Sequence, residues 1–311
     1  MTLISFCYGL QFLATMQTKH QIRQLLSSAG IRPNRRLGQH FLIDLNLMKL
    51  LVDSANIQKD DVVLEVGCGT GSMTGLLAQK AGRVIAVELD RNLAEIAEKQ
   101  LADAKNIQLI NTDILESKHK FNQTVSDALA LAREQHRGRL LLVSNLPYDV
   151  ASSLMMNLVT GPTVADAMYV TIQKEVADRM TAAPGSGNYG ILSIFLGATG
   201  EVKSIRTLKP SVFWPRPKVD SAMVGFVRNR AKSERIADME LFSEIVHLFM
   251  GHRRKIVLSC CKLADGKLRQ IADWGEILEN CQISPKRRPE TLSPEDYLCI
   301  ANCAGNSIFL Y

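Results

Sequence analysis

The sequence predicts a Rossmann-like α/β fold with a parallel sheet, followed by a small C-terminal helical domain. Short β-branched segments alternate with helical segments over residues 62–172, and this alternation is typical of a parallel sheet. A glycine-rich turn at 67–71 connects the first of these strands to its helix. From Asn229 onward strand signals end, and apolar residues recur at helical spacing.

The first half of the chain has a regular order of elements. Asp44 is a suitable N-cap for a helix that extends to about Ala55. Runs rich in β-branched residues predict buried strands at 62–66, 83–88 and 107–110, with helices at 71–81 and 90–101. The polar residues 116–138 are expected to be partly helical and to lie along an edge of the sheet.

The second half continues the alternation up to residue 180. Strands are predicted at 139–144 and 168–172, helices at 150–159 and 174–180, and a loop at 184–190. Two further strands are expected at Ser193–Thr199 and Lys218–Val227, on either side of the proline-rich segment 210–217.

These elements divide the chain into three parts: an N-terminal tail at 1–30, an α/β domain at 31–228 and a helical domain at 229–311. Residues 1–15 carry no charge and lack the positive start of a secretory signal. We interpret them as a misassigned translation start ahead of Met16, or as a loose tail. No segment approaches the roughly 20 apolar residues of a membrane span.

The net charge of +6 is unevenly distributed over the 311 residues. Residues 1–50 hold six basic residues and one acidic residue, and residues 202–230 hold seven and one. Such clusters suit a polyanionic partner, although a solvated surface is the alternative. The seven cysteines form no CxxC pair and the histidines show no ligand spacing, so we expect no metal. Dispersed cysteines fit a reducing compartment, here the cytoplasm.

A first chemical motif surrounds the glycine-rich turn. Gly67 and Gly69 allow the backbone to turn sharply and to approach a ligand closely. Glu88 follows Gly67 by 21 residues, at the end of the second strand, where a carboxylate can hold ribose hydroxyls. Asp113 ends the third strand at the same edge of the sheet.

Two cofactors fit this motif, and a turn without a ligand is the alternative. A dinucleotide fingerprint reads G-x-G-x-x-G, but Ser72 stands at its last glycine. Glu65, two residues before the first glycine, matches the E/D-x-G-x-G-x-G form of methyltransferases. We therefore favour S-adenosylmethionine over a nicotinamide dinucleotide.

The second motif is Asn145-Leu146-Pro147-Tyr148, which directly follows the fourth strand. The exocyclic amine of adenine is a poor nucleophile because its lone pair is delocalised into the ring. Two acceptors aimed at its N–H groups would free that pair: the side-chain oxygen of Asn145 and the carbonyl of Leu146, whose direction the following proline fixes. Tyr148 can stack on the base. Alternatively, the tetrapeptide is a simple turn.

Together these motifs resemble the rRNA adenine N6,N6-dimethyltransferase family over about residues 30–300. Further matches are LGQHFL at 37–42, QKEV at 173–176, NYG at 188–190 and FWPRPKVDS at 213–221. The resemblance implies a class I methyltransferase sheet with S-adenosylmethionine as cofactor. It also implies dimethylation of two adjacent adenosines in a hairpin near the 3′ end of small-subunit (16S) rRNA, during ribosome biogenesis.

The resemblance also implies partners and roles for individual residues. The partner would be small-subunit rRNA in a pre-30S particle, with the protein expected to be a monomer, away from membranes. The cofactor would be bound by His40, Leu42, Gly67, Gly69, Glu88, Asp113 and Asn145. Family members often carry Asn where His40 stands. Asp113 would accept from the amine of the cofactor's adenine.

The target base would be held by residues from two segments. Asn145 and Leu146 would accept from its amine, while Tyr148 and Phe213 would clamp its two faces. A core anchor is the alternative for Phe213. Basic runs at 253–255 and 286–288 in the helical domain would bind rRNA phosphates.

Three other functions stay open. A non-catalytic rRNA-binding relative would not need the intact motif at 145–148. A nicotinamide oxidoreductase would not explain why this motif is present. A related methylase of large-subunit rRNA shares QHFL at 39–42. The sequences of 213–221 and 283–297, however, are more similar to those of the small-subunit rRNA methyltransferases.

Overall fold

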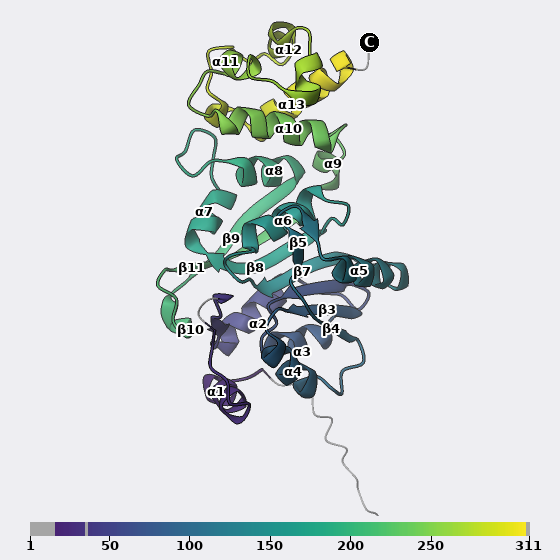
Figure 1. Ribbon diagram of the computed structural model, residues 1–311, viewed down its shortest axis with the longest axis vertical. Coiled ribbons are helices and arrows are strands. Elements are labelled where there is room, and N and C mark those ends of the chain that lie inside the picture. Colours follow the sequence, from purple (N-terminus) through teal and green to yellow (C-terminus); the bar gives the residue numbers. More distant parts are fainter. Residues whose placement is uncertain (1–15, 35–36, 309–311) are drawn as a thin grey trace, which may run out of the picture.

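A seven-stranded sheet forms the centre of the protein (Figure 1). The structure is a computed structural model that describes residues 16–34 and 37–308. The order is β4-β3-β2-β7-β8-β11-β9. The first five of these strands are parallel, and β11 is antiparallel to both β8 and β9. The strands are β2 (Val62–Val66), β3 (Arg83–Glu88), β4 (Ile107–Asn111), β7 (Leu140–Asn145), β8 (Ala167–Gln173), β9 (Gly200–Leu208) and β11 (Ser221–Arg228). The predicted α/β fold with a largely parallel sheet is confirmed.

Helices cover both faces of the sheet. One face packs on α2 (Leu45–Ser54), α3 (Ser72–Ala78) and α4 (Arg91–Gln100), and the other on α5 (Gln123–Gln135), α6 (Ala151–Thr160) and α7 (Lys174–Met180). Neighbouring residues of β2 illustrate this, because Val62 belongs to one apolar core and Val63 to the other. Burial on two faces explains why the central strands read as uninterrupted apolar runs.

The strand expected at Ser193–Thr199 is wrong. These residues lie in a helix, α8 (Ile191–Thr199), and the strand follows it as β9. A short, mostly apolar run fits a buried helix as well as a buried strand, and periodicity does not separate the two. β9 is a partly exposed edge strand rich in charge, so it lacks the apolar signal used to find strands.

Several smaller elements were not predicted, because none of the sequence patterns considered above marks them. Helix α1 (Lys19–Ser28) begins at the N-cap Thr18 with a capping box to Gln21, inside the segment expected to be a tail. Two strand pairs are β1 (Phe41–Leu42) with β10 (Phe213–Trp214), and β5 (Leu115–Ser117) with β6 (Lys120–Phe121). The interpretation of residues 1–15 lies outside the described part of the chain.

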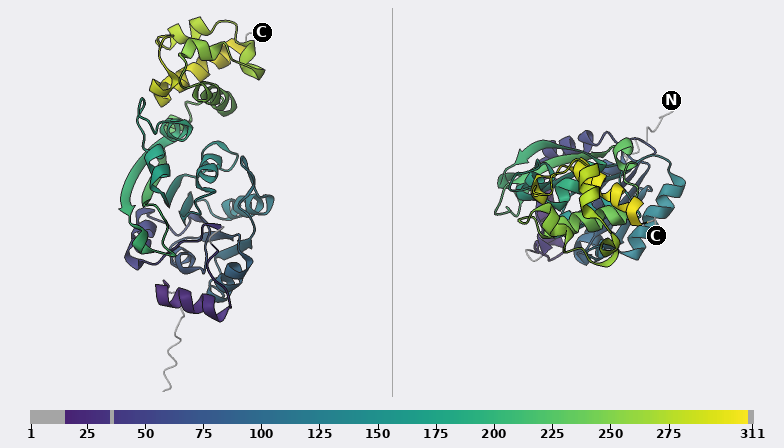
Figure 2. Two further views of the ribbon diagram at one scale, coloured as in Figure 1. Left: turned by 60° about the vertical axis from the view of Figure 1, so that its left-hand side comes forward. Right: turned by 90° about the horizontal axis from the view of Figure 1, so that it is seen from above.

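After β11 ends at Arg228, every further described element is a helix. These elements form a layer at the opposite end of the molecule from α1 (Figures 1 and 2). They are α9 (Arg230–Ser233), α10 (Met239–Gly251), α11 (Val257–Cys261), α12 (Trp274–Asn280) and α13 (Pro294–Ile308), with 3-10 turns at Gly266–Gln270 and Pro289–Thr291. The Phe195 ring of α8 meets the Phe242 ring of α10 edge-on at 5.2 Å, and one apolar core continues across this junction. Among the described helices, none has the length and apolarity that crossing a membrane requires.

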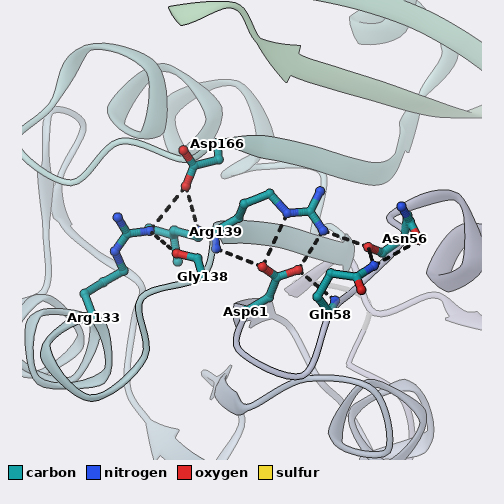
Figure 3. A network of polar contacts seen from close by, with 8 residues as sticks. Asn56, Gln58, Asp61, Arg133, Gly138, Arg139 and Asp166 are labelled. Carbon is teal, nitrogen blue, oxygen red and sulfur yellow. Dashed lines mark hydrogen bonds and ion pairs between the residues drawn. The ribbon is translucent and has the colours of Figure 1, made fainter.

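A polar network fastens the amino ends of the parallel strands (Figure 3). Asp61 precedes β2 and accepts hydrogen bonds from Arg139, which precedes β7, including one of 2.6 Å from the guanidinium. Burial alone would raise the pKa of Asp61, but the bonds from Arg139 and Gln58 together hold it below its usual value. Asp166 accepts from Arg133 and from the backbone N–H of Leu140. This network leaves the opposite, carboxyl ends of the strands available for ligands.

Candidate active site

A cavity opens at the carboxyl ends of the parallel strands, which is where open α/β sheets bind ligands. It is lined by segments 37–42, 65–70, 87–89, 112–114 and 145–150, together with residues from α1, α2, α3 and α4. Nine of the ten residues selected from the sequence contribute to its wall: His40, Leu42, Gly67, Gly69, Glu88, Asp113, Asn145, Leu146 and Tyr148.

The glycine turn brings the two sequence motifs together. The N–H of Gly67 donates to the carbonyl of Val87 at 2.8 Å, which ties the turn to the end of β3. Gly67 has a φ of +77°, and a Cβ there would lie 2.8 Å from Cγ of Pro147. Any larger residue would therefore push against the 145–148 segment, so these two loops can meet only through glycine.

Glu88 is buried and organises the floor of the cavity. Its Oε2 accepts from the N–H of Gly69 at 2.8 Å, and its Oε1 accepts from the N–H of Asp90 at 2.9 Å. Burial raises the pKa of Glu88 in spite of these two bonds. Each carboxylate oxygen can accept a second hydrogen bond, so the fixed side chain still offers two acceptors to a ligand with adjacent hydroxyls.

Glu65 is a buried acid whose role the sequence did not reveal beyond its place in the motif. Its side chain is 1% exposed, and burial, followed by repulsion from Glu88, raises its pKa to about 8. The nearby Thr74 hydroxyl opposes the shift, yet Oε2 of Glu65 and Oγ1 of Thr74 have no hydrogen-bond partner. Because Glu65 also lines the cavity, a ligand with a cationic group would complete this site.

Cys68, in the same turn, is also buried. Burial, together with Glu65 and Glu88, raises the pKa of its thiol well above the usual value. Since the thiolate is the nucleophile, Cys68 is held in its unreactive form.

Asn145 is held by hydrogen bonds on both sides of its amide. Its Nδ2 donates to the carbonyl of His40 at 2.8 Å, and its Oδ1 accepts a short hydrogen bond from Oγ1 of Thr171. The backbone carbonyl of Thr171 accepts from the N–H of Leu146 at 3.1 Å. Thr171 therefore fixes both proposed acceptor residues. Sequence reasoning missed it, because its position opposite Asn145 comes from the register of the parallel β7–β8 pair and no local sequence pattern marks it.

Tyr148 and His40 form a second group beside Asn145. The hydroxyl of Tyr148 lies 3.0 Å from Oγ of Ser221, and its ring lies 5.6 Å from the His40 ring at a tilt of 32°. Nδ1 of His40 lies 2.6 Å from the carbonyl of Pro215. A carbonyl can only accept, so Nδ1 carries the proton. His40 thus links the proline-rich segment to the wall of the cavity.

Phe213 is the one selected residue that the structure does not bring to the cavity. It is 2% exposed, pairs with Leu42 in the β1–β10 ladder and belongs to the core beneath α2. This location matches the alternative of a core anchor, and a role in clamping the base stays a prediction.

The N-terminal segment contributes a residue that the sequence did not indicate. Gln17 is buried, and its side chain donates to the carbonyl of Thr70 and accepts from the Thr70 hydroxyl. Its backbone N–H donates to Oγ of Ser72 at 2.7 Å. Gln17 therefore holds the end of the glycine turn from outside the sheet.

The basic clusters divide into half-buried members and exposed members. Arg228 donates to the carbonyls of Leu158 and Val159 near the end of α6 and of Ala165 in the loop that follows, Arg253 pairs with Glu290, and Arg287 pairs with Asp296. These side chains have structural partners. The exposed members are Lys19, Arg23, Arg32, Lys49, Lys203, Arg206, Lys209, Arg216, Lys218, Arg230, Arg254, Lys255, Lys286 and Arg288. Of these, Lys49, Lys209 and Arg230 form ion pairs with Asp53, Asp220 and Glu234. The runs at 253–255 and 286–288 are neighbours, because the N–H of Val257 donates to the carbonyl of Arg287. Arg35 and Arg36 lie outside the described residues.

Solved structures show the same fold. A dimethyladenosine transferase from Plasmodium falciparum superposes with a TM-score of 0.64 at 21% identity, covering 82% of this chain and 94% of the other. A 23S rRNA methyltransferase gives a TM-score of 0.58 at 21% identity, covering 85% and 99%. At this identity the likeness concerns the fold alone.

Sequence relatives are much closer. Proteins named ribosomal RNA small subunit methyltransferase A are 33% identical in Geobacillus sp. (strain WCH70), over 92% of this chain and 96% of that protein, and 37% identical in Alkaliphilus metalliredigens, over 88% and 93%. The family model for ribosomal RNA adenine dimethylase matches residues 30–300. The chain therefore belongs to the ribosomal RNA adenine dimethylase family.

Proposed function

We propose that this protein transfers methyl groups from S-adenosylmethionine to N6 of two adjacent adenosines in a hairpin near the 3′ end of small-subunit rRNA, during ribosome biogenesis in the cytoplasm. The observation that carries the proposal is the meeting of two loops. Gly67 of the cofactor-type turn lies directly against Pro147 of the 145–148 segment, so both motifs face one cavity.

The residues present fit S-adenosylmethionine. Glu65 is a buried acid with an unsatisfied oxygen at the cavity wall, which suits the ammonium of the methionine part. Glu88 is fixed by two backbone bonds and keeps acceptors for the ribose hydroxyls. Asp113, with Oδ1 occupied by the N–H of Leu115, would use Oδ2 toward the adenine amine. His40 and Leu42 would lie near the methionine end.

S-adenosylmethionine, when bound, supplies a methyl group on a positively charged sulfur. The chain itself prepares the target amine. Asn145 Oδ1 and the Leu146 carbonyl would accept from the two N–H groups of adenine, which localises the nitrogen lone pair. Both residues are fixed by Thr171 before the substrate arrives, and such preorganised dipoles contribute most as charge develops.

Tyr148 would supply the stacking surface for the base. Its hydroxyl is already occupied by Ser221, so the ring is held in one orientation. Base stacking on an aromatic ring contributes roughly 1–3 kcal/mol. No residue is needed as a base before transfer, because the amine proton becomes acidic only as the methyl group arrives.

The exposed basic residues would bind the rRNA backbone. Arg254, Lys255, Lys286 and Arg288 gather on the helical part, and a second group extends along β9 and the proline-rich segment. Phosphate contacts of this kind release counterions, so affinity should fall steeply with salt.

Small-subunit and large-subunit particles from cells that lack this gene, assayed separately, provide the test. They are incubated with the purified protein and S-adenosylmethionine, and the rRNA is read by primer extension. Two adjacent stops near the 3′ end are expected. Stops confined to large-subunit rRNA would instead establish the related methylase activity, and absence of any stop would support a non-catalytic role.

A further inference from the structure

Three cysteines that are far apart in the sequence meet in the C-terminal helical part. The sulfur atoms of Cys281, Cys299 and Cys303 all lie within 4.8 Å of one another. Cys281 and Cys303 are the nearest pair, at 3.8 Å. All three are free thiols of intermediate burial, so they are accessible to an ion without being loose on the surface.

Two elements fix the positions of these sulfur atoms. Cys281 is the C-cap of α12, where its N–H donates to the carbonyl of Ile277 at 3.1 Å. Cys299 and Cys303 lie one turn apart on α13, on the same face of that helix. Cys281 and Cys303 also pack against the main apolar core. Helices α12 and α13 lie together at the C-terminal end of the molecule (Figure 1).

The spacing suits a metal with sulfur ligands. A Zn²⁺ ion with bonds of about 2.3 Å in tetrahedral geometry places neighbouring sulfurs about 3.8 Å apart. The Cys281–Cys303 separation of 3.8 Å already has this value. Cys299 lies within 4.8 Å of both, so a small side-chain rotation would complete the set.

The chemistry of the donors narrows the choice of ion. An all-sulfur set selects soft or borderline ions such as Zn²⁺, and disfavours Mg²⁺, Ca²⁺ and Mn²⁺, which prefer oxygen. The cluster contains a third sulfur, which a disulfide between Cys281 and Cys303 would leave unused.

We propose that Cys281, Cys299 and Cys303 form a three-sulfur Zn²⁺ site that joins the end of α12 to α13, with solvent as the fourth ligand. This replaces the expectation of no metal, which rested on the absence of CxxC spacing. The three cysteines lack CxxC spacing because Cys299 and Cys303 lie one turn apart on α13 and Cys281 comes from a different helix. The ion would link α12, a short helix of seven residues, to α13, the longest described helix of the chain.

The full chain is stripped of metal with a chelator under a thiol-free reductant and then titrated with Zn²⁺ against a chromophoric competitor. Co²⁺ serves as a spectroscopic probe in parallel. We expect one ion per chain, with sulfur-to-cobalt charge-transfer bands. Cys281→Ser, Cys299→Ser and Cys303→Ser should each weaken binding by at least the roughly 10–100-fold that loss of an outer-shell partner costs.

Cys261→Ala is the matched control, because Cys261 lies in the same helical part but outside the cluster. It should bind Zn²⁺ like the wild type, and Zn²⁺ should raise its thermal unfolding midpoint, whereas the three Ser variants should show no such rise. Wild-type protein without charge-transfer bands would overturn the proposal, even if a variant failed to fold. Equal Zn²⁺ affinity in the wild type and the three Ser variants would overturn it as well.

Discussion

Glu65→Gln should make the protein more stable at neutral pH and should remove much of the pH dependence of that stability. Glu65 is fully buried at the end of β2, and its Oε2 has no hydrogen-bond partner. Burial favours the protonated acid, which raises its pKa from 4.5 to about 8. Glutamine has nearly the same shape and carries no charge to desolvate.

The sign of the effect follows from proton binding. Between pH 4.5 and about 8 the folded protein holds a proton on Glu65 that the unfolded chain has lost. The free energy of unfolding therefore falls as the pH rises through this range, by about 1.4 kcal/mol per pH unit. The full difference amounts to about 5 kcal/mol above pH 8, and about 3 kcal/mol is present at pH 7.

Urea unfolding at pH 5, 7 and 8.5 measures this effect, with wild type and Glu65→Gln compared at each pH. The difference between the two proteins isolates Glu65 from Glu88 and other titrating groups. We expect the variant to gain stability relative to the wild type as the pH rises. A difference that stays constant from pH 5 to 8.5 would refute a raised pKa at Glu65.

Three further predictions concern the cavity. Glu88→Ala should weaken S-adenosylmethionine binding roughly 10²–10⁴-fold, since two charge-assisted bonds are lost and each contributes roughly 1.5–3 kcal/mol; calorimetry that shows an unchanged Kd would remove Glu88 from the cofactor site. Thr171→Val should lower kcat about 10-fold at unchanged cofactor Kd, because Asn145 loses the hydroxyl that orients it, while Thr171→Ser should restore the rate; equal rates in all three proteins would show that Thr171 does not position Asn145. Tyr148→Phe should keep most activity and Tyr148→Ala should lose target binding in a filter assay, because the ring face stacks on the base; equal loss in both would assign the role to the hydroxyl.

The sequence was sufficient for those parts of the fold and site in which local pattern and tertiary structure agree. The central strands are buried on both faces, so their apolar runs were unambiguous. The carboxyl ends of parallel strands meet at one edge, which is why Gly67, Glu88, Asp113 and Asn145 converge as expected.

Other parts depend on contacts that no local pattern encodes. Ser193–Thr199 is mostly apolar because α8 is buried between the sheet and α10, so its sequence predicts a strand as readily as a helix. Thr171 acquires its role only through the register of β8 with β7. Phe213 is an aromatic residue of the kind that can stack on a base, but the pairing of β1 with β10 places its side chain in the core.

The most direct test of the account is the rate of the chemical step in Asn145→Ala. Single-turnover methylation of undimethylated small-subunit particles is measured at saturating S-adenosylmethionine, beside calorimetric binding of the cofactor. Because Asn145 is fixed by His40 and Thr171 as a preorganised acceptor, we expect the rate to fall by about 10²–10³ while the fold is kept and the cofactor Kd changes little. A variant that methylates at close to the wild-type rate would contradict the proposed mechanism.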